Sequence, residues 1–156
     1  MYKRILVGVD GSAASDRGLD EAIRFAKATG GQLLIVHVVN ELIAGNYVAS
    51  LSYDKVIDSL RDAGKRALEE AAAKARSANV PCEQKLLEAL GERTADQIVK
   101  EARSWPADLI VLGTHGRRGL KRLALGSDAE LVLRMSPVPV LLVREQPEAD
   151  VSAREK

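Results

Sequence analysis

The stretch that decides the fold is Leu33-Leu34-Ile35-Val36-His37-Val38-Val39. Its apolar residues follow one another with almost no polar alternation, which is typical of a strand covered on both faces in a parallel sheet. Similar runs begin at Ile5, Leu109 and Val138. The segment from Cys82 to Ala89 is half polar, which favours a strand at the edge of the sheet.

Helical patterns separate these runs. Apolar residues recur at i, i+3, i+4 and i+7 from Leu19 and again from Ala95. A long helix is expected over about 54–78, where good helix formers are dense, and a short one over 127–135. Strands that alternate with helices through right-handed crossovers predict an α/β fold, a three-layer αβα, doubly wound sheet of parallel strands.

Length, charge and cysteine content restrict the possible functions. The chain has 156 residues, a formal net charge of +1, one cysteine, and only three Tyr, one Trp and one Phe. We therefore expect one domain over 1–145 with a polar, mobile tail over 146–156, no nucleic-acid partner, and a reducing, cytoplasmic location. No apolar run approaches the roughly 20 residues of a membrane span, so no membrane partner is expected.

The residues that follow the strands are the candidates for a ligand site, because open parallel sheets bind ligands at the carboxyl ends of their strands. Asp10 follows the first strand, and 40–53 is long and aperiodic enough to be a binding loop. After the fourth strand, three glycines and four cations lie within 113–122, and Ser127-x-x-Glu130 matches a capping box. This pattern predicts either a phosphate site or a basic, solvated loop that ends in an ordinary N-cap.

Other motifs fail or have structural explanations. Gly64-Lys65 is followed by Arg66, so there is no P-loop, and neither a dinucleotide fingerprint, a nucleophile elbow nor a zinc-ligand spacing occurs. Structural roles are expected for four other residues: an N-cap for Ser12, core packing for His37, helix-end packing for Trp105, and no special role for Cys82.

The spacing of glycines resembles a known signature. Gly113-x2-Gly116-x9-Gly126-Ser127 is similar to the ATP-binding signature of the universal stress protein family, in its nucleotide-binding branch. Three further segments resemble that family: Lys3–Ser12, His37-Val38 and Pro137–Val143. The similarity spans about residues 2–144, and it implies five parallel strands in the order 3-2-1-4-5.

The resemblance also implies roles for individual residues. Gly8 and Val9 would line the base pocket, Asp10 would bond the ribose or the adenine edge, and the Val38 backbone would read the adenine. Gly113 and Gly116 would pass under the ribose and α-phosphate, with His115 and Arg117 beside them. Amides of Gly126, Ser127 and Ala129 would hold the β- and γ-phosphates of ATP, with Mg²⁺ on the phosphates; ADP or AMP are the alternatives.

One position departs from the family's pattern. Asp128 stands where the family usually has a small or apolar residue, and a carboxylate beside a γ-phosphate is repulsive unless a metal bridges them. Either Asp128 only complements the helix dipole, or triphosphate affinity is reduced and a shorter nucleotide also binds.

The function implied is that of a homodimeric, nucleotide-dependent regulator in stress response, with slow or no hydrolysis, because no general base is identifiable. Dimers would pair through the strand Val138–Val143, and the protein partners are unknown. Two rivals remain. One is a nucleotide-independent interaction module of the same fold. The other is an adenylyltransferase or ATP pyrophosphatase, whose His-x-Gly-His or Ser-Gly-Gly-x-Asp-Ser signature is absent.

Overall fold

The computed structural model describes residues 1–41, 52–115 and 125–145, and strands alternate with helices along them. None of the helices in these ranges is both long and apolar enough to cross a bilayer. The elements are β1 (Arg4–Gly8), α1 (Ala13–Thr29), β2 (Gln32–Asn40), α3 (Tyr53–Ser77), β3 (Cys82–Ala89), α4 (Thr94–Ser104), β4 (Leu109–Gly113), α5 (Ser127–Met135) and β5 (Val140–Val143).

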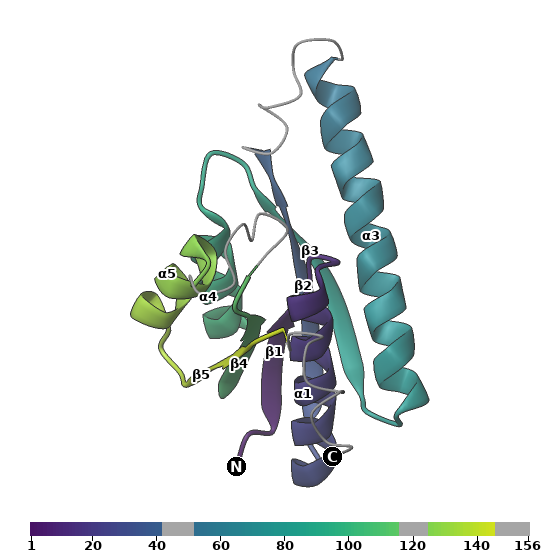
Figure 1. Ribbon diagram of the computed structural model, residues 1–156, viewed down its shortest axis with the longest axis vertical. Helices are drawn as coiled ribbons and strands as arrows, with labels where there is room; N and C mark the ends of the chain where they lie inside the picture. The colour runs from purple at the N-terminus through teal and green to yellow at the C-terminus, as the bar shows by residue number, and fades with distance from the viewer. Residues whose placement is uncertain (42–51, 116–124, 146–156) are drawn as a thin grey trace, which may run out of the picture.

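The five strands form one parallel sheet in the order β3-β2-β1-β4-β5. Helices α1 and α3 lie on one face and α4 and α5 on the other, as Figure 1 shows. This arrangement confirms the predicted three-layer, doubly wound fold and its strand order. It also confirms the half-polar strand β3 at an edge and the short helix over 127–135.

The core explains why the strand runs lack polar alternation. Ile5 and Val7 pack with residues of α1 and α3, whereas Leu6, between them, packs with residues of α4 and α5. All three are completely buried. Since successive side chains of a strand point to opposite faces, a sheet covered on both faces needs an apolar residue at every position.

Helix α1, which follows β1, and helix α5, which follows residues 116–124, have different N-caps. Ser12 is the N-cap of α1 and its side chain accepts from Ser15 N, as predicted. The capping-box prediction for Ser127 is wrong, because Gly126 is the N-cap of α5 and Ser127 is its first helical residue. The reason is tertiary: Gly126 N donates to Thr114 O at 2.8 Å, which holds residue 126 in an extended conformation outside the helix.

The first turn of α1 lies directly against the end of β4. A Cβ on Gly113 would lie 2.6 Å from the carbonyl carbon of Ala14 and 2.8 Å from Ser15 N, both backbone atoms. A Cβ on Gly18, one turn further along α1, would lie 3.4 Å from Gly113 N. The absence of a side chain at residue 113 therefore allows α1 to approach the sheet at the edge where β4 ends.

Gly113→Ala should destabilise the fold by about 1–3 kcal/mol, because neither α1 nor β4 can move its backbone without disturbing the core. Urea unfolding measures the loss. The control is Gly8→Ala, whose Cβ would meet Leu112 Cδ2 at 2.8 Å, the end of a side chain that can rotate away. Equal losses in the two variants would contradict the close backbone contact as the cause.

Candidate functional site

The strand order reverses at β1, which has β2 on one side and β4 on the other. In open α/β sheets, this switch point at the carboxyl ends of the strands is where ligands bind. The segments that leave β1 and β4 meet there, since Ser12 Oγ lies 3.3 Å from His115 O and donates to it. The candidate site is this edge, together with the first turn of α5.

Asp10 orders the turn between β1 and α1. Its Oδ1 accepts from Ser12 N at 2.8 Å, and its own amide donates to Ser15 Oγ at 3.2 Å. Gly11, between them, has φ +78°, a left-handed conformation that favours glycine. Asp10 thus has the turn-ordering role that its position allows, and a contact with a ribose or an adenine stays a prediction.

His37 is buried beneath this turn, which confirms its predicted place in the core. Its Nδ1 lies 2.8 Å from Val9 O. A Cβ on Gly64 would lie 2.6 Å from His37 Cδ2, so α3 packs on the ring through a glycine. The ring therefore connects α3 to the Val9 backbone, which would line the base pocket. Val38, the next residue of β2, is half-buried.

The segment after β4 is held by backbone hydrogen bonds and leaves one side-chain nitrogen unsatisfied. Thr114 N donates to Val143 O at 2.9 Å, and Thr114 Oγ1 lies 2.9 Å from His115 Nδ1. His115 Nε2 is buried and has no hydrogen-bond partner within the described ranges. A buried polar atom without a partner costs about 1–3 kcal/mol, so a hydrogen bond from outside the described residues would stabilise this nitrogen, as donor or as acceptor according to the tautomer of the ring.

The first turn of α5 adds backbone donors. The first α-helical hydrogen bond runs from Glu130 N to Gly126 O, so the amides before it have no acceptor inside the helix. No described side chain caps this end. The Gly126 amide is already bonded to Thr114 O, which leaves the amides of Ser127 and Ala129 as the predicted donors to an anion.

Two predicted ligand residues, Gly116 and Arg117, lie outside the described residues. Gly113 and Gly126, at the two ends of the signature spacing, belong to the described part of the chain, and each has a structural role. Gly113 admits the α1 backbone, and Gly126 anchors α5 to Thr114. The roles proposed for Gly8, Val9, Val38 and the signature residues toward a nucleotide remain predictions.

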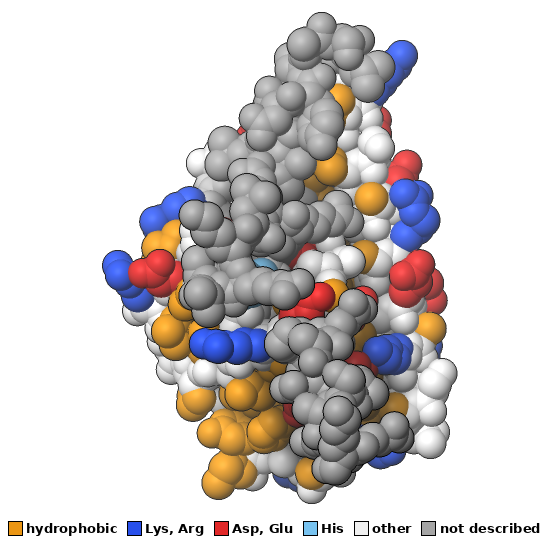
Figure 2. All heavy atoms as spheres, in the orientation of Figure 1, with side chains coloured by type: hydrophobic (Ala, Val, Ile, Leu, Met, Phe, Trp, Pro, Cys, Tyr) orange, Lys and Arg blue, Asp and Glu red, His pale blue; other side chains and the backbone are white. Residues whose placement is uncertain are grey.

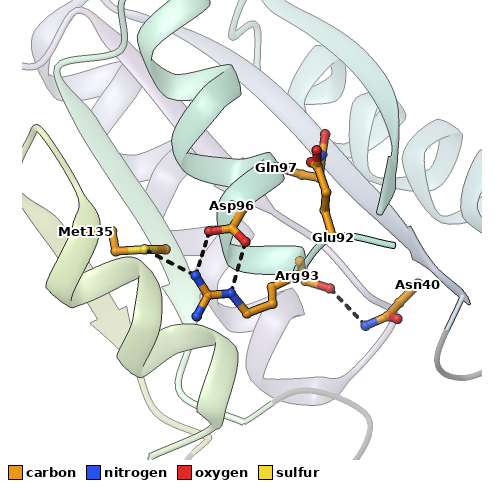
Figure 3. A network of polar contacts seen from close by, with 7 residues as sticks. Asn40, Glu92, Arg93, Asp96, Gln97 and Met135 are labelled. Atoms are coloured by element: carbon orange, nitrogen blue, oxygen red, sulfur yellow. Dashed lines mark hydrogen bonds and ion pairs between the residues drawn. The ribbon is translucent and has the colours of Figure 1, made fainter. Parts of the chain in front are cut away.

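The pattern of the sequence did not reveal a polar network that joins β2, α4 and α5 (Figure 3). Asn40, at the end of β2, donates to Thr94 Oγ1 at 3.1 Å. Arg93 forms a two-bond ion pair with Asp96 at 2.9 and 3.1 Å, and its Nη2 lies 4.0 Å from Met135 Sδ. Because its guanidinium is paired with Asp96, Arg93 stabilises the N-terminal end of α4 and its charge is already partly neutralised.

A second network involves Glu41, the residue after β2. Its carboxylate accepts from the Tyr53 hydroxyl and from Gly91 N. The bond to Glu41 raises the pKa of Tyr53 to about 12, because losing the phenolic proton would place two negative charges together. Glu41 and Tyr53 lie near the two ends of the predicted binding loop, 40–53, of which residues 42–51 lie outside the described ranges.

Trp105 and Cys82 lie away from this edge, as expected. Trp105 is the C-cap of α4. The Arg4 guanidinium lies over its indole ring, with Arg4 Cζ 4.6 Å from the ring centroid. Burial raises the pKa of the Cys82 thiol, which disfavours the reactive thiolate.

Comparison with known proteins places the chain among proteins of one kind. The universal stress protein family profile matches residues 1–144. Universal stress protein YxiE of Bacillus subtilis is 34% identical over 151 residues, which cover 92% of this chain and all of that one.

Two solved structures with nucleotides are similar in fold. One is a universal stress protein in complex with cAMP, with a TM-score of 0.67, 29% identity, and coverage of 91% of this chain and 98% of that one. The other is the universal stress protein of Archaeoglobus fulgidus in complex with dAMP, with a TM-score of 0.64, 26% identity, and coverage of 91% and 98%. By its sequence, its sheet topology and the extent of these matches, the chain belongs to the universal stress protein family.

Proposed function

We propose that this protein binds an adenine nucleotide at the edge between β1 and β4 and acts as a nucleotide-dependent regulator in stress response. The observation that carries the proposal is the buried Nε2 of His115, which has no hydrogen-bond partner among the described residues, near the first turn of α5, which no described side chain caps. The cAMP and dAMP complexes of two relatives support the ligand class. The ligand we propose is ATP with Mg²⁺ on its phosphates, with ADP or AMP as shorter alternatives.

The adenosine half of the ligand would occupy the end of β1. Gly8 and Val9 would line the base pocket, the Val38 backbone would read the adenine, and Asp10 would bond the ribose or the adenine edge. Their positions support this. Val9 O is hydrogen-bonded to His37 Nδ1, and Asp10 Oδ1 accepts from Ser12 N, so both groups are ordered without a ligand.

The phosphates would lie between the β4 segment and α5. His115 Nε2 and the amides of Ser127 and Ala129 would donate to phosphate oxygens, where the N-terminal end of the helix dipole also favours negative charge. Gly113 would pass beneath the ribose, and Gly116 and Arg117 are included on the strength of the signature spacing alone.

We propose regulation by occupancy, in which the bound nucleotide changes a surface that unknown protein partners read. Hydrolysis would be slow or absent. A cytoplasmic location remains a prediction from the single cysteine. The rival of a nucleotide-independent interaction module predicts no bound nucleotide, and the rival enzymes predict fast, substrate-dependent release of pyrophosphate.

Gly126→Val and Gly116→Val should each weaken adenine nucleotide binding by about tenfold or more, because a branched side chain would occupy space needed by the phosphates. At Gly126, valine is compatible with the backbone, since φ is −59° and ψ is 145°. Isothermal titration calorimetry measures affinity, and chromatography of nucleotide released by denaturing fresh protein identifies the occupant. Leu133→Ala, at an exposed position of α5, is the control. Normal binding by both valine variants would refute this phosphate site.

His115→Phe should weaken nucleotide binding by about tenfold, because it keeps the ring but removes the nitrogen that would donate to a phosphate. The variant also loses the contact between Nδ1 and Thr114 Oγ1, so urea unfolding should show a fall of about 0.5–1.5 kcal/mol in stability beside the loss of affinity. Calorimetry and urea unfolding of the same preparation give both numbers. Unchanged affinity with reduced stability would instead assign His115 a purely structural role.

We propose that the protein forms a homodimer through its C-terminal strand, β5. This strand is at the edge of the described sheet, and Val140, Leu141 and Leu142 are only half-buried. Apolar side chains gather at the lower left of the face in Figure 2, where Figure 1 has β5 and the chain leading into it. An exposed, apolar edge strand favours pairing with a second copy.

Leu142→Pro should convert the dimer to a monomer. Pro139 O and Val143 O accept from Ile110 N and Thr114 N of the β4 segment, so by alternation the Leu142 amide points away from β4. Proline removes this outward donor. Leu142→Ala, which keeps the amide, should stay dimeric in sedimentation equilibrium. A monomeric wild-type protein, or a dimeric proline variant, would rule out this interface.

A further inference from the structure

Thr114, the residue after β4, is buried, and each of its polar groups contacts another described residue. Only 6% of its surface is exposed. Its amide donates to Val143 O of β5 at 2.9 Å, and its carbonyl oxygen accepts from Gly126 N at 2.8 Å. Its hydroxyl oxygen lies 2.9 Å from His115 Nδ1. The Thr114 backbone is therefore fixed from two sides, and the stiff χ1 of a β-branched side chain holds the hydroxyl against the imidazole.

The two nitrogens of the His115 ring are in different situations. Nδ1 contacts the Thr114 hydroxyl, whereas Nε2 is buried and has no hydrogen-bond partner in the part of the chain that the structure describes. The backbone of His115 is held as well, because Ser12 Oγ donates to His115 O at 3.3 Å. Of the two ring nitrogens, Nε2 is thus the one left for a ligand.

The proton of a neutral imidazole lies on one of its two nitrogens, and the hydrogen bonds of the neighbours distinguish the two tautomers. If Nδ1 carries the proton, it donates to Thr114 Oγ1, and the hydroxyl then needs an acceptor of its own, which no described residue provides. If Nε2 carries the proton, the hydroxyl donates to Nδ1 and both of these atoms are satisfied. Because an unsatisfied buried donor costs free energy, the contact favours the tautomer with the proton on Nε2.

We propose that Thr114 is a positioning residue, which holds His115 as the Nε2–H tautomer and so makes Nε2 a hydrogen-bond donor to the ligand. A donor at this position suits an anionic oxygen, such as a phosphate oxygen of a nucleotide. The inference rests on the proposed nucleotide site, and it specifies which atom of that site selects for a phosphate and which residue sets its proton. It requires no charge on the imidazole.

The other histidine of the chain offers a comparison within the same molecule. His37 Nδ1 lies 2.8 Å from Val9 O. A carbonyl oxygen can only accept, so Nδ1 of His37 carries a proton. We therefore expect the two neutral histidines to be opposite tautomers, because a carbonyl contacts Nδ1 of His37 and a hydroxyl contacts Nδ1 of His115.

Long-range ¹H–¹⁵N correlation spectra of the full chain at about pH 8, where histidines are ordinarily neutral, show which nitrogen carries the proton. His115→Phe, which lacks one set of signals, assigns them. Wild-type protein without nucleotide should have the proton on Nε2 of His115 and on Nδ1 of His37. Thr114→Val, which keeps the branched shape without the hydroxyl, should give mixed tautomers at His115, and Thr114→Ser should restore the wild-type pattern. A proton on Nδ1 of His115 in wild-type protein, or an unchanged pattern in Thr114→Val, would overturn the role of Thr114.

Calorimetry with AMP and with Mg-ATP tests the consequence for binding. Thr114→Val should weaken binding by about three- to tenfold, and Thr114→Ser by much less. In His115→Phe protein, which has no imidazole to orient, Thr114→Val should have no further effect on affinity. A residue that only supports the fold would not show this coupling, so equal losses in both backgrounds would contradict the positioning role.

The same measurements separate this inference from the proposed function on which it rests. Failure of wild-type protein to bind either nucleotide would overturn the nucleotide site and, with it, the donor role of Nε2. The spectra, which need no ligand, would still decide whether Thr114 sets the proton of His115.

Discussion

The contact between the α1 backbone and the end of β4 is the constraint on which the candidate site depends. Gly113 lets Ala14 and Ser15 approach at distances that no side chain would permit. As a result, the segment after β1 and the segment after β4 are brought together, and Ser12 can donate to His115 O. A glycine expected to make room for a ligand makes room for the helix at one side of the candidate site.

The donors at this edge belong mainly to the backbone. The first-turn amides of α5 are fixed by the helix, and the helix is fixed by Gly126 against Thr114. Two cations near this edge are engaged with carboxylates: Arg93 with Asp96, and Arg134 with Glu130. Amide donors at a helix N-terminus, with one imidazole nitrogen near them, would suit an anionic ligand.

Much of the fold could be predicted from the sequence because burial on both faces of the sheet leaves a direct trace in it. The run 33–39 predicts a central strand, and β2 is next to β1 within the sheet; the half-polar 82–89 predicts the edge strand β3. The bounds of α5 were also predictable, although its cap was not. The cap depends on the hydrogen bond from Gly126 N to Thr114 O, which joins residues far apart in the sequence. A local sequence pattern cannot predict such a bond.

The candidate site was less predictable for the same reason. The spacing of Gly113 and Gly126 identified the segments, but the packing of Gly113 on Ala14 depends on where α1 crosses the sheet. The networks around Glu41 and Arg93 join elements that are distant in sequence, so no sequence motif predicts them. His115 was a candidate by position, but sequence alone does not show that its Nε2 is buried without a hydrogen-bond partner in the described part of the chain.

The most direct test of the central claim is a titration of ¹⁵N-labelled full-length protein with AMP and with Mg-ATP, followed by amide shifts. The account predicts that the amides of Asp10, His115, Ser127 and Ala129 shift first and together, because one ligand would touch all three segments on which they lie. Shifts confined to another surface, such as the hollow between α1 and α3 lined by Ile23, Lys27 and Lys74, or no shifts at all, would contradict it.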